Sequence, residues 1–108
     1  MLIIRNKYSR LENIRKIAIL ADPACRKGWE KNFPRLLEKA VREQQPDLFL
    51  VAGDMALNAT QQEYLKILEY MSRYEKIWAA VPGDHDRPLK YFRKYFGTLR
   101  KVIDAGRW

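Results

Sequence analysis

The sequence predicts an α/β fold with a mostly parallel sheet and flanking helices. Three apolar runs without polar alternation, 16–21, 48–52 and 77–81, are typical of strands that are buried on both faces. The stretches between them repeat apolar residues at helical spacing. The resulting βαβαβ order favours right-handed crossovers and therefore parallel strands.

The first part of the chain contains one strand and one helix of this pattern. Residues 2–4 can add an edge strand ahead of the first main strand, 16–21. The stretch 22–28 contains Pro and Gly and is expected to be a loop. An amphipathic helix is expected from about Asn32, with Pro34 in its first turn, where proline is tolerated.

The second part of the chain carries clear helix boundaries. Thr60 and Glu63 have the spacing of a capping box, in which each side chain bonds the other residue's backbone N–H. The helix that they begin leads to the strand 77–81. A short helix ended by Gly97 is then expected, and 99–103 is a candidate last strand.

The size and composition indicate one globular domain of 108 residues, with a basic N-terminal extension at 1–15 and a core at 16–106. Its 47% hydrophobic and 31% charged content excludes a disordered chain. The sequence contains no apolar run of the roughly 18 residues that a membrane span needs and no signal peptide, so we expect a cytoplasmic protein. The single Cys25 excludes an internal disulfide and is consistent with a reducing compartment.

The formal net charge of +8 is concentrated at the two ends. Residues 1–16 hold five basic and one acidic side chain, a net charge of +4, and residues 87–108 hold seven and one, a net charge of +6. The middle is slightly acidic. Basic ends around an acidic centre fit a polyanionic ligand, although such charges also simply keep a small domain in solution.

An aspartate follows each predicted main strand. Asp22 comes directly after the first, Asp54 two residues after the second and Asp84 three residues after the third. Because parallel strands align their carboxyl ends, all three are expected at one edge of the sheet. Neighbouring carboxylates repel unless a cation neutralises them, and their oxygens suit Mg²⁺ or Mn²⁺. A single aspartate in such a place is more often a turn former or a helix cap, but three in register favour a site.

The only histidine, His85, lies between Asp84 and Asp86 at the end of the third strand. It can serve as a proton donor or as a ligand of a borderline metal, although a lone histidine is more often a surface residue. Gly53 and Gly83 precede the second and third aspartates, and a residue without Cβ lets the backbone turn sharply and approach a ligand closely.

These motifs resemble the N-terminal half of the calcineurin-like metallophosphoesterases, which reads strand, D-x-H, helix, strand, G-D, helix, strand and G-N-H-D or G-N-H-E. The matching residues are Asp22, then Gly53 and Asp54, then the run 83–86. The resemblance covers about residues 16–106 and implies about half of the family's two-sheet sandwich.

The resemblance implies a two-metal phosphoesterase that acts on phosphodiesters or phosphomonoesters through a metal-bound hydroxide. Asp54 would bridge the two ions, Asp22 would bind one and Asp84 the other. His85 would assist the leaving group, and Asp86 would support the histidine or cap the next segment.

The sequence departs from the family pattern at several positions. Ala24 stands where the family has a metal-binding histidine, and Asp84 replaces the usual asparagine. The sequence ends where the family's second half, with further histidines, would begin. One hard ion held by Asp22, Asp54 and Asp84 stays feasible, whereas Cys25 is expected to be inert.

Three functions therefore stay open: a metal-dependent phosphoesterase, a catalytically silent module that binds metal, a phosphate ligand or a protein, and a nucleic-acid-binding protein that uses its basic ends.

If the three main strands lie in sequential order, right-handed crossovers place both long helices on one face of the sheet. The other face is then covered by the N-terminal segment, by the last helix or by another subunit. We expect a homodimer that packs through this face.

Overall fold

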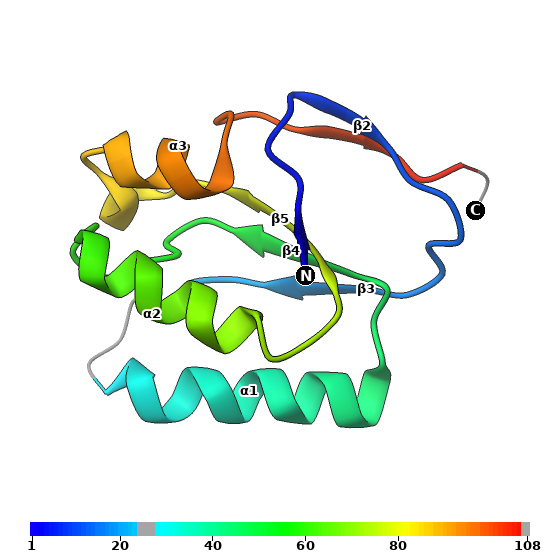
Figure 1. Cartoon of the computed structure of the whole chain (residues 1–108), viewed down its shortest axis with the longest axis horizontal. Helices are drawn as coiled ribbons and strands as arrows, with labels where there is room; N and C mark the ends of the chain where they lie inside the picture. Colours follow the sequence, from blue (N-terminus) through cyan, green and yellow to red (C-terminus); the bar gives the residue numbers. More distant parts are fainter. Residues whose placement is uncertain (24–27, 107–108) are drawn as a thin grey trace.

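The central element is a four-stranded parallel sheet with the strand order β1-β5-β4-β3 (Figure 1). The computed structural model describes residues 1–23 and 28–106. The strands are β1 (Leu2–Ile3), β3 (Ile17–Leu20), β4 (Leu48–Ala52) and β5 (Ile77–Val81). The predicted α/β class, the parallel sheet and the N-terminal edge strand are confirmed, and the three main strands lie in sequential order.

Three helices lie on one side of this sheet: α1 (Trp29–Gln44), α2 (Gln61–Met71) and α3 (Lys90–Phe96) (Figure 1). A single 3₁₀ turn, η1 (Asp84–Asp86), precedes α3, which ends at Gly97 as predicted. The capping box of α2 is present. Within the described ranges, none of the helices has the length and apolarity needed to cross a membrane. The cytoplasmic location stays a prediction.

Helix α1 begins earlier than its apolar periodicity predicted, at Trp29 instead of about Asn32. The predicted position of Pro34 in the first turn was therefore wrong, because it lies in the second turn. The early start follows from the packing of the Trp29 indole, which is buried with its ring centroid 6.5 Å from that of Phe33 and 6.2 Å from that of Tyr70.

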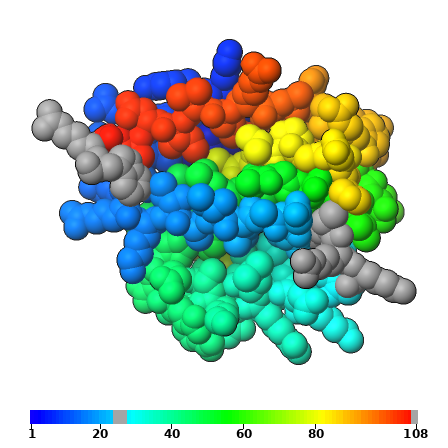
Figure 2. All heavy atoms as spheres, turned by 180° about the vertical axis from the view of Figure 1, so that it is seen from behind, coloured from blue at the N-terminus to red at the C-terminus, as the bar shows by residue number. Residues whose placement is uncertain are grey.

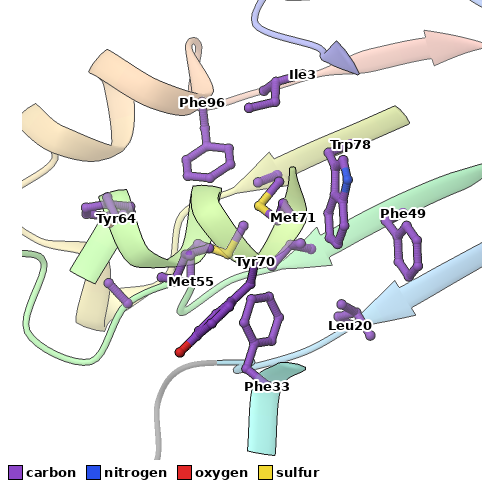
Figure 3. Packing of buried hydrophobic residues seen from close by; sticks show 14 of the residues in the cluster. Ile3, Leu20, Phe33, Phe49, Met55, Tyr64, Tyr70, Met71, Trp78 and Phe96 are labelled. Carbon is purple, nitrogen blue, oxygen red and sulfur yellow. The ribbon is translucent and has the colours of Figure 1, made fainter. Parts of the chain in front are cut away.

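The main core fills the space between the helices and the sheet (Figure 3). Phe49 of β4 and Trp78 of β5 stack with ring centroids 4.3 Å apart, and neither side chain is exposed. Phe33, Tyr64 and Phe96 bring one buried aromatic ring from each helix. This packing fixes the strands from which the site loops emerge.

The two ends of the chain form a second, smaller sheet (Figure 1). β2 (Tyr8–Arg10) pairs in parallel with β6 (Val102–Asp104). The expected last strand is therefore real but begins at Val102 and lies outside the main sheet, and β2 was not predicted at all. We call this pair the terminal ribbon.

The face of the main sheet opposite the helices is only partly covered. Ile14 and Ile103 pack over the starts of β4 and β5 in a second buried cluster. Toward the strand ends, 68% of Ile19 and 37% of Val81 are exposed, beside a hollow of about 420 Å³ (Figure 2). The prediction that all three main strands are buried on both faces was wrong for β3, because the face opposite the helices is open beside this edge strand and leaves Ile17 and Ile19 exposed. The homodimer stays a prediction.

Candidate functional site

The loops that follow β3, β4 and β5 are joined at the carboxyl edge of the sheet. The Asp22 N–H donates to the Gly53 carbonyl at 3.2 Å, and the Gly53 N–H donates to the Val81 carbonyl at 3.1 Å. Asp22 and Asp54 both have φ of 54°, in the left-handed region that aspartate tolerates better than most residues. The first two motif loops therefore turn in the same way and lie side by side.

Gly83 brings the third motif loop against the second. A Cβ at this position would lie 2.6 Å from the Asp54 backbone nitrogen and closer still to the Asp54 carboxylate. No side chain fits there, because real Cβ atoms do not approach so closely. The requirement for glycine is steric here, since the Gly83 φ of −116° is one that other residues adopt.

Asp54 and His85 are joined through the backbone. The half-buried Asp54 accepts the His85 N–H on Oδ1 at 2.9 Å, which orients its carboxylate toward the start of η1. The exposed His85 ring lies with Nδ1 3.0 Å from the Leu57 carbonyl. Because a carbonyl oxygen only accepts, Nδ1 carries the proton in this contact, and Nε2 is the ring atom left to exchange a proton.

Asp86 is completely buried. Its carboxylate accepts the N–H groups of Met55 at 3.0 Å, Ala56 at 2.9 Å and Gly83 at 2.9 Å, and the Tyr64 hydroxyl at 2.7 Å. Four converging donors compensate for the removal of this carboxylate from water. Asp86 thus ties the loop after β4 to the loop after β5.

Tyr64 reaches Asp86 from helix α2. Burial raises the pKa of the Tyr64 hydroxyl well above its ordinary value, and its hydrogen bond to the Asp86 carboxylate raises it further. The phenol therefore keeps its proton and donates it to Asp86 throughout the neutral pH range. Helical periodicity alone places Tyr64 on the apolar face of its helix and gives no sign of the bond to Asp86, although a buried tyrosine usually needs a hydrogen-bond partner.

Glu63 does more than close the capping box. Its carboxylate accepts the backbone N–H groups of Leu57 at 3.1 Å, Asn58 at 3.0 Å and Thr60 at 3.1 Å. These bonds fix the segment whose Leu57 carbonyl contacts His85. The capping pattern predicted only the bond to Thr60.

The aspartates lie at one edge but do not form a complete metal site. Asp84 is exposed at the first position of η1, and Asp22 is exposed after β3. Within 1–23 and 28–106, no group of three or more His, Cys, Asp and Glu side chains is arranged to hold a metal ion. Ala24 and Cys25 lie outside the described residues. The carboxylates have the chemistry of Mg²⁺ or Mn²⁺ ligands, but this part of the chain supplies only an incomplete set.

The family model for calcineurin-like phosphoesterases matches residues 15–107. The chain belongs to this family. No curated protein and no solved structure matches the chain. The resemblance drawn from the three motifs is confirmed, and the sheet with its flanking helices is compatible with part of a metallophosphoesterase fold. The family generally uses divalent metals.

Proposed function

We propose that this calcineurin-like phosphoesterase takes part in metal-dependent hydrolysis of phosphoric esters, with Asp54 as a metal ligand and His85 as a proton donor. The proposal rests on one observation. The Asp54 carboxylate holds the His85 backbone while the Leu57 carbonyl orients the His85 ring, so both groups belong to one fixed unit. Family membership supports a phosphate-containing substrate.

Asp22 and Asp54 are the carboxylates that would hold a divalent ion, with Mn²⁺ or Mg²⁺ as the proposed ion and Asp84 as a third ligand. A bound ion of this kind neutralises charge on phosphoryl oxygens and lowers the pKa of a bound water. Further ligands would have to come from outside the described residues. Asp84 brings a further negative charge to the same edge, which favours a hard cation.

His85 is assigned the proton transfer to the leaving oxygen. Its Nδ1–H contact with Leu57 directs Nε2 away from that carbonyl, and the protonated ring can donate from Nε2. Asp86 takes no part in the chemistry and instead positions Asp54 and His85 through the two loops that it joins.

The test is the Mn²⁺-stimulated hydrolysis of an aryl phosphodiester such as bis(4-nitrophenyl) phosphate. Asp54→Asn should reduce the stimulated rate to background, and His85→Ala should reduce it by about 100-fold, as expected for loss of a general acid. Glu38→Gln, an exposed carboxylate on α1, is the matched control and should keep the wild-type rate. An unchanged rate in Asp54→Asn would refute the proposal.

A second candidate is a catalytically silent module that binds a metal ion or a phosphate compound. The incomplete carboxylate set in the described part of the chain favours it. This candidate predicts that Mn²⁺ or inorganic phosphate raises the melting temperature of the wild type and not of Asp54→Asn, without turnover of the phosphodiester.

A further inference from the structure

The topology brings the two basic ends of the chain together. Tyr8 lies opposite Val102 in the terminal ribbon, and Arg10 lies opposite Asp104. Just before the ribbon, the Thr98 N–H donates to the Arg5 carbonyl at 3.0 Å. The N-terminal segment therefore runs beside the segment that follows α3, although the two are far apart in sequence (Figure 1).

Charge is separated between these ends and the rest of the molecule. Residues 1–16 carry a net charge of +4, and residues 87–106, with six basic and one acidic side chain, carry +5. Residues 17–86 hold nine basic and eleven acidic side chains, a net charge of −2. We define the terminal basic surface by five exposed side chains of the two ends: Arg5, Lys7, Arg93, Lys94 and Arg100.

Arg5 and Arg93 line one open hollow of about 410 Å³. The Arg5 Nε donates to the Tyr95 carbonyl at 3.1 Å, which fixes the direction of its side chain. A Cβ at Gly97 would lie 2.6 Å from the Arg5 Cβ, so the two segments are in direct contact there. Two cationic groups lining one hollow repel each other, and an anion between them removes the repulsion.

Tyr8 adds an exposed aromatic ring to the terminal ribbon. It is 60% exposed, and its ribbon neighbour Val102 is 54% exposed. Because side chains alternate along a strand, Tyr8 and Arg10 lie on the outer side of the ribbon while Ser9 lies on the inner side. The Tyr8 hydroxyl donates to Asp104 Oδ2 at 3.3 Å, which orients the ring, and Arg10 lies on the same outer side of the ribbon. An exposed ring with a cationic side chain on the same side is a combination that binds a nucleic acid strand, with a phosphate on the cation and a base on the ring.

We propose that the terminal basic surface binds the backbone of a single-stranded nucleic acid and that Tyr8 stacks on one of its bases. A lipid surface fits less well, because the apolar side chains of α3, Phe92 and Phe96, are completely buried and leave the helix nothing to insert. The proposal goes beyond the proposed hydrolysis and does not depend on it, because it involves neither Asp54 nor a metal ion.

The test measures fluorescence anisotropy of a labelled single-stranded oligonucleotide of about 20 nucleotides in EDTA, over a series of salt concentrations from about 50 mM upward. The variant Arg93→Glu/Arg100→Glu should bind at least about tenfold more weakly, and its dependence on salt should be shallower, because fewer phosphates are neutralised. Lys31→Glu/Lys39→Glu on α1 makes the same charge change elsewhere and should alter the affinity less than about twofold.

Tyr8 is tested separately from the charges. Tyr8→Ala should weaken binding by about tenfold without changing the salt dependence, and Tyr8→Phe, which keeps the ring, should bind like the wild type. Thermal melts establish that each variant is folded. The proposal is overturned if the wild type does not bind at about 50 mM salt, if the α1 variant loses as much affinity as the Arg93 and Arg100 variant, or if anionic vesicles compete as well as unlabelled oligonucleotide.

Discussion

The hydroxyl of Tyr64 donates to the carboxylate of Asp86 at 2.7 Å, and both side chains are completely buried. This bond connects helix α2 to the turn η1, while three backbone donors connect the same carboxylate to the loops after β4 and β5. The geometry of Asp54 and His85 therefore depends on a residue that is itself completely buried.

Asp86→Asn should destabilise the protein by about 3 kcal/mol, because the amide nitrogen cannot accept the hydrogen bonds that a carboxylate oxygen accepts at this place. Urea unfolding gives this free energy. Tyr64→Phe removes one donor and leaves the other three bonds, so it should cost less, about 1 kcal/mol. Equal costs for the two variants would contradict the role of Asp86 as the shared acceptor.

Gly83→Ala should displace the Asp54 loop, because the added Cβ would overlap the Asp54 backbone and carboxylate. We expect a loss of at least about 2 kcal/mol in the free energy of unfolding. Gly106→Ala is the control: its φ is +80° but nothing lies within 4 Å of the added Cβ, so only the backbone strain of about 1 kcal/mol applies. A larger loss in Gly106→Ala than in Gly83→Ala would show that the steric argument is wrong.

Glu63→Ala should loosen the segment that orients His85, since Glu63 accepts three of its backbone N–H groups. We expect a destabilisation of about 2 kcal/mol and faster amide hydrogen exchange at Leu57 and Asn58. Glu69→Ala, at an exposed position of the same helix, should change neither quantity. Unchanged amide hydrogen exchange at Leu57 in Glu63→Ala would show that Glu63 does not hold this segment in place.

Lys101 should make stability depend on pH in the alkaline range. Burial lowers its pKa to about 8 from 10.5, and its Nζ donates to the Ala80 and Thr98 carbonyls beside the Phe92 ring. The folded state then binds this proton less tightly than the unfolded chain. The free energy of unfolding should therefore fall as the pH drops from about 10.5 to about 8 and stay lower below that.

Lys101→Met removes this ionisation while keeping an unbranched side chain. Urea unfolding at pH 8 and pH 10 should show a smaller difference in the variant than in the wild type. The same difference in both proteins would mean that Lys101 is not the group responsible.

The homodimer is predicted to form through the exposed part of the main sheet, on the face opposite the helices. Sedimentation at micromolar concentration should give a dimer for the wild type and a monomer for Ile19→Lys, because a charge at this exposed apolar position opposes burial. Leu65→Lys, at a half-exposed position on α2, should stay dimeric. A monomeric wild type would contradict the prediction.

Local sequence patterns predicted β4, β5 and the start of α2, because continuous apolar runs and a capping box act within a few neighbouring residues. The terminal ribbon was only half predicted. Its strands are three residues long and come from opposite ends of the chain, so neither carries a local signal for the pairing. The exposure of Ile19 also has no local signal in the sequence, because it depends on which distant segments cover that face of the sheet.

The sequence was enough to place the residues of the candidate site in the fold, but not to predict their contacts. The order of strands and motifs was enough to place Asp22, Asp54 and the 83–86 run at one edge. The burial of Asp86 was not predictable, because three of its four donors, Met55, Ala56 and Tyr64, are 22 to 31 residues away in the sequence and only the fold brings them to it.

Calorimetric titration of the metal-free protein with Mn²⁺ measures whether Asp54 binds a divalent ion at the carboxyl edge of the sheet. Wild type and Glu38→Gln should bind with the same affinity, and Asp54→Asn should bind at least about tenfold more weakly. Equal Mn²⁺ affinity in wild type and Asp54→Asn would contradict the claim.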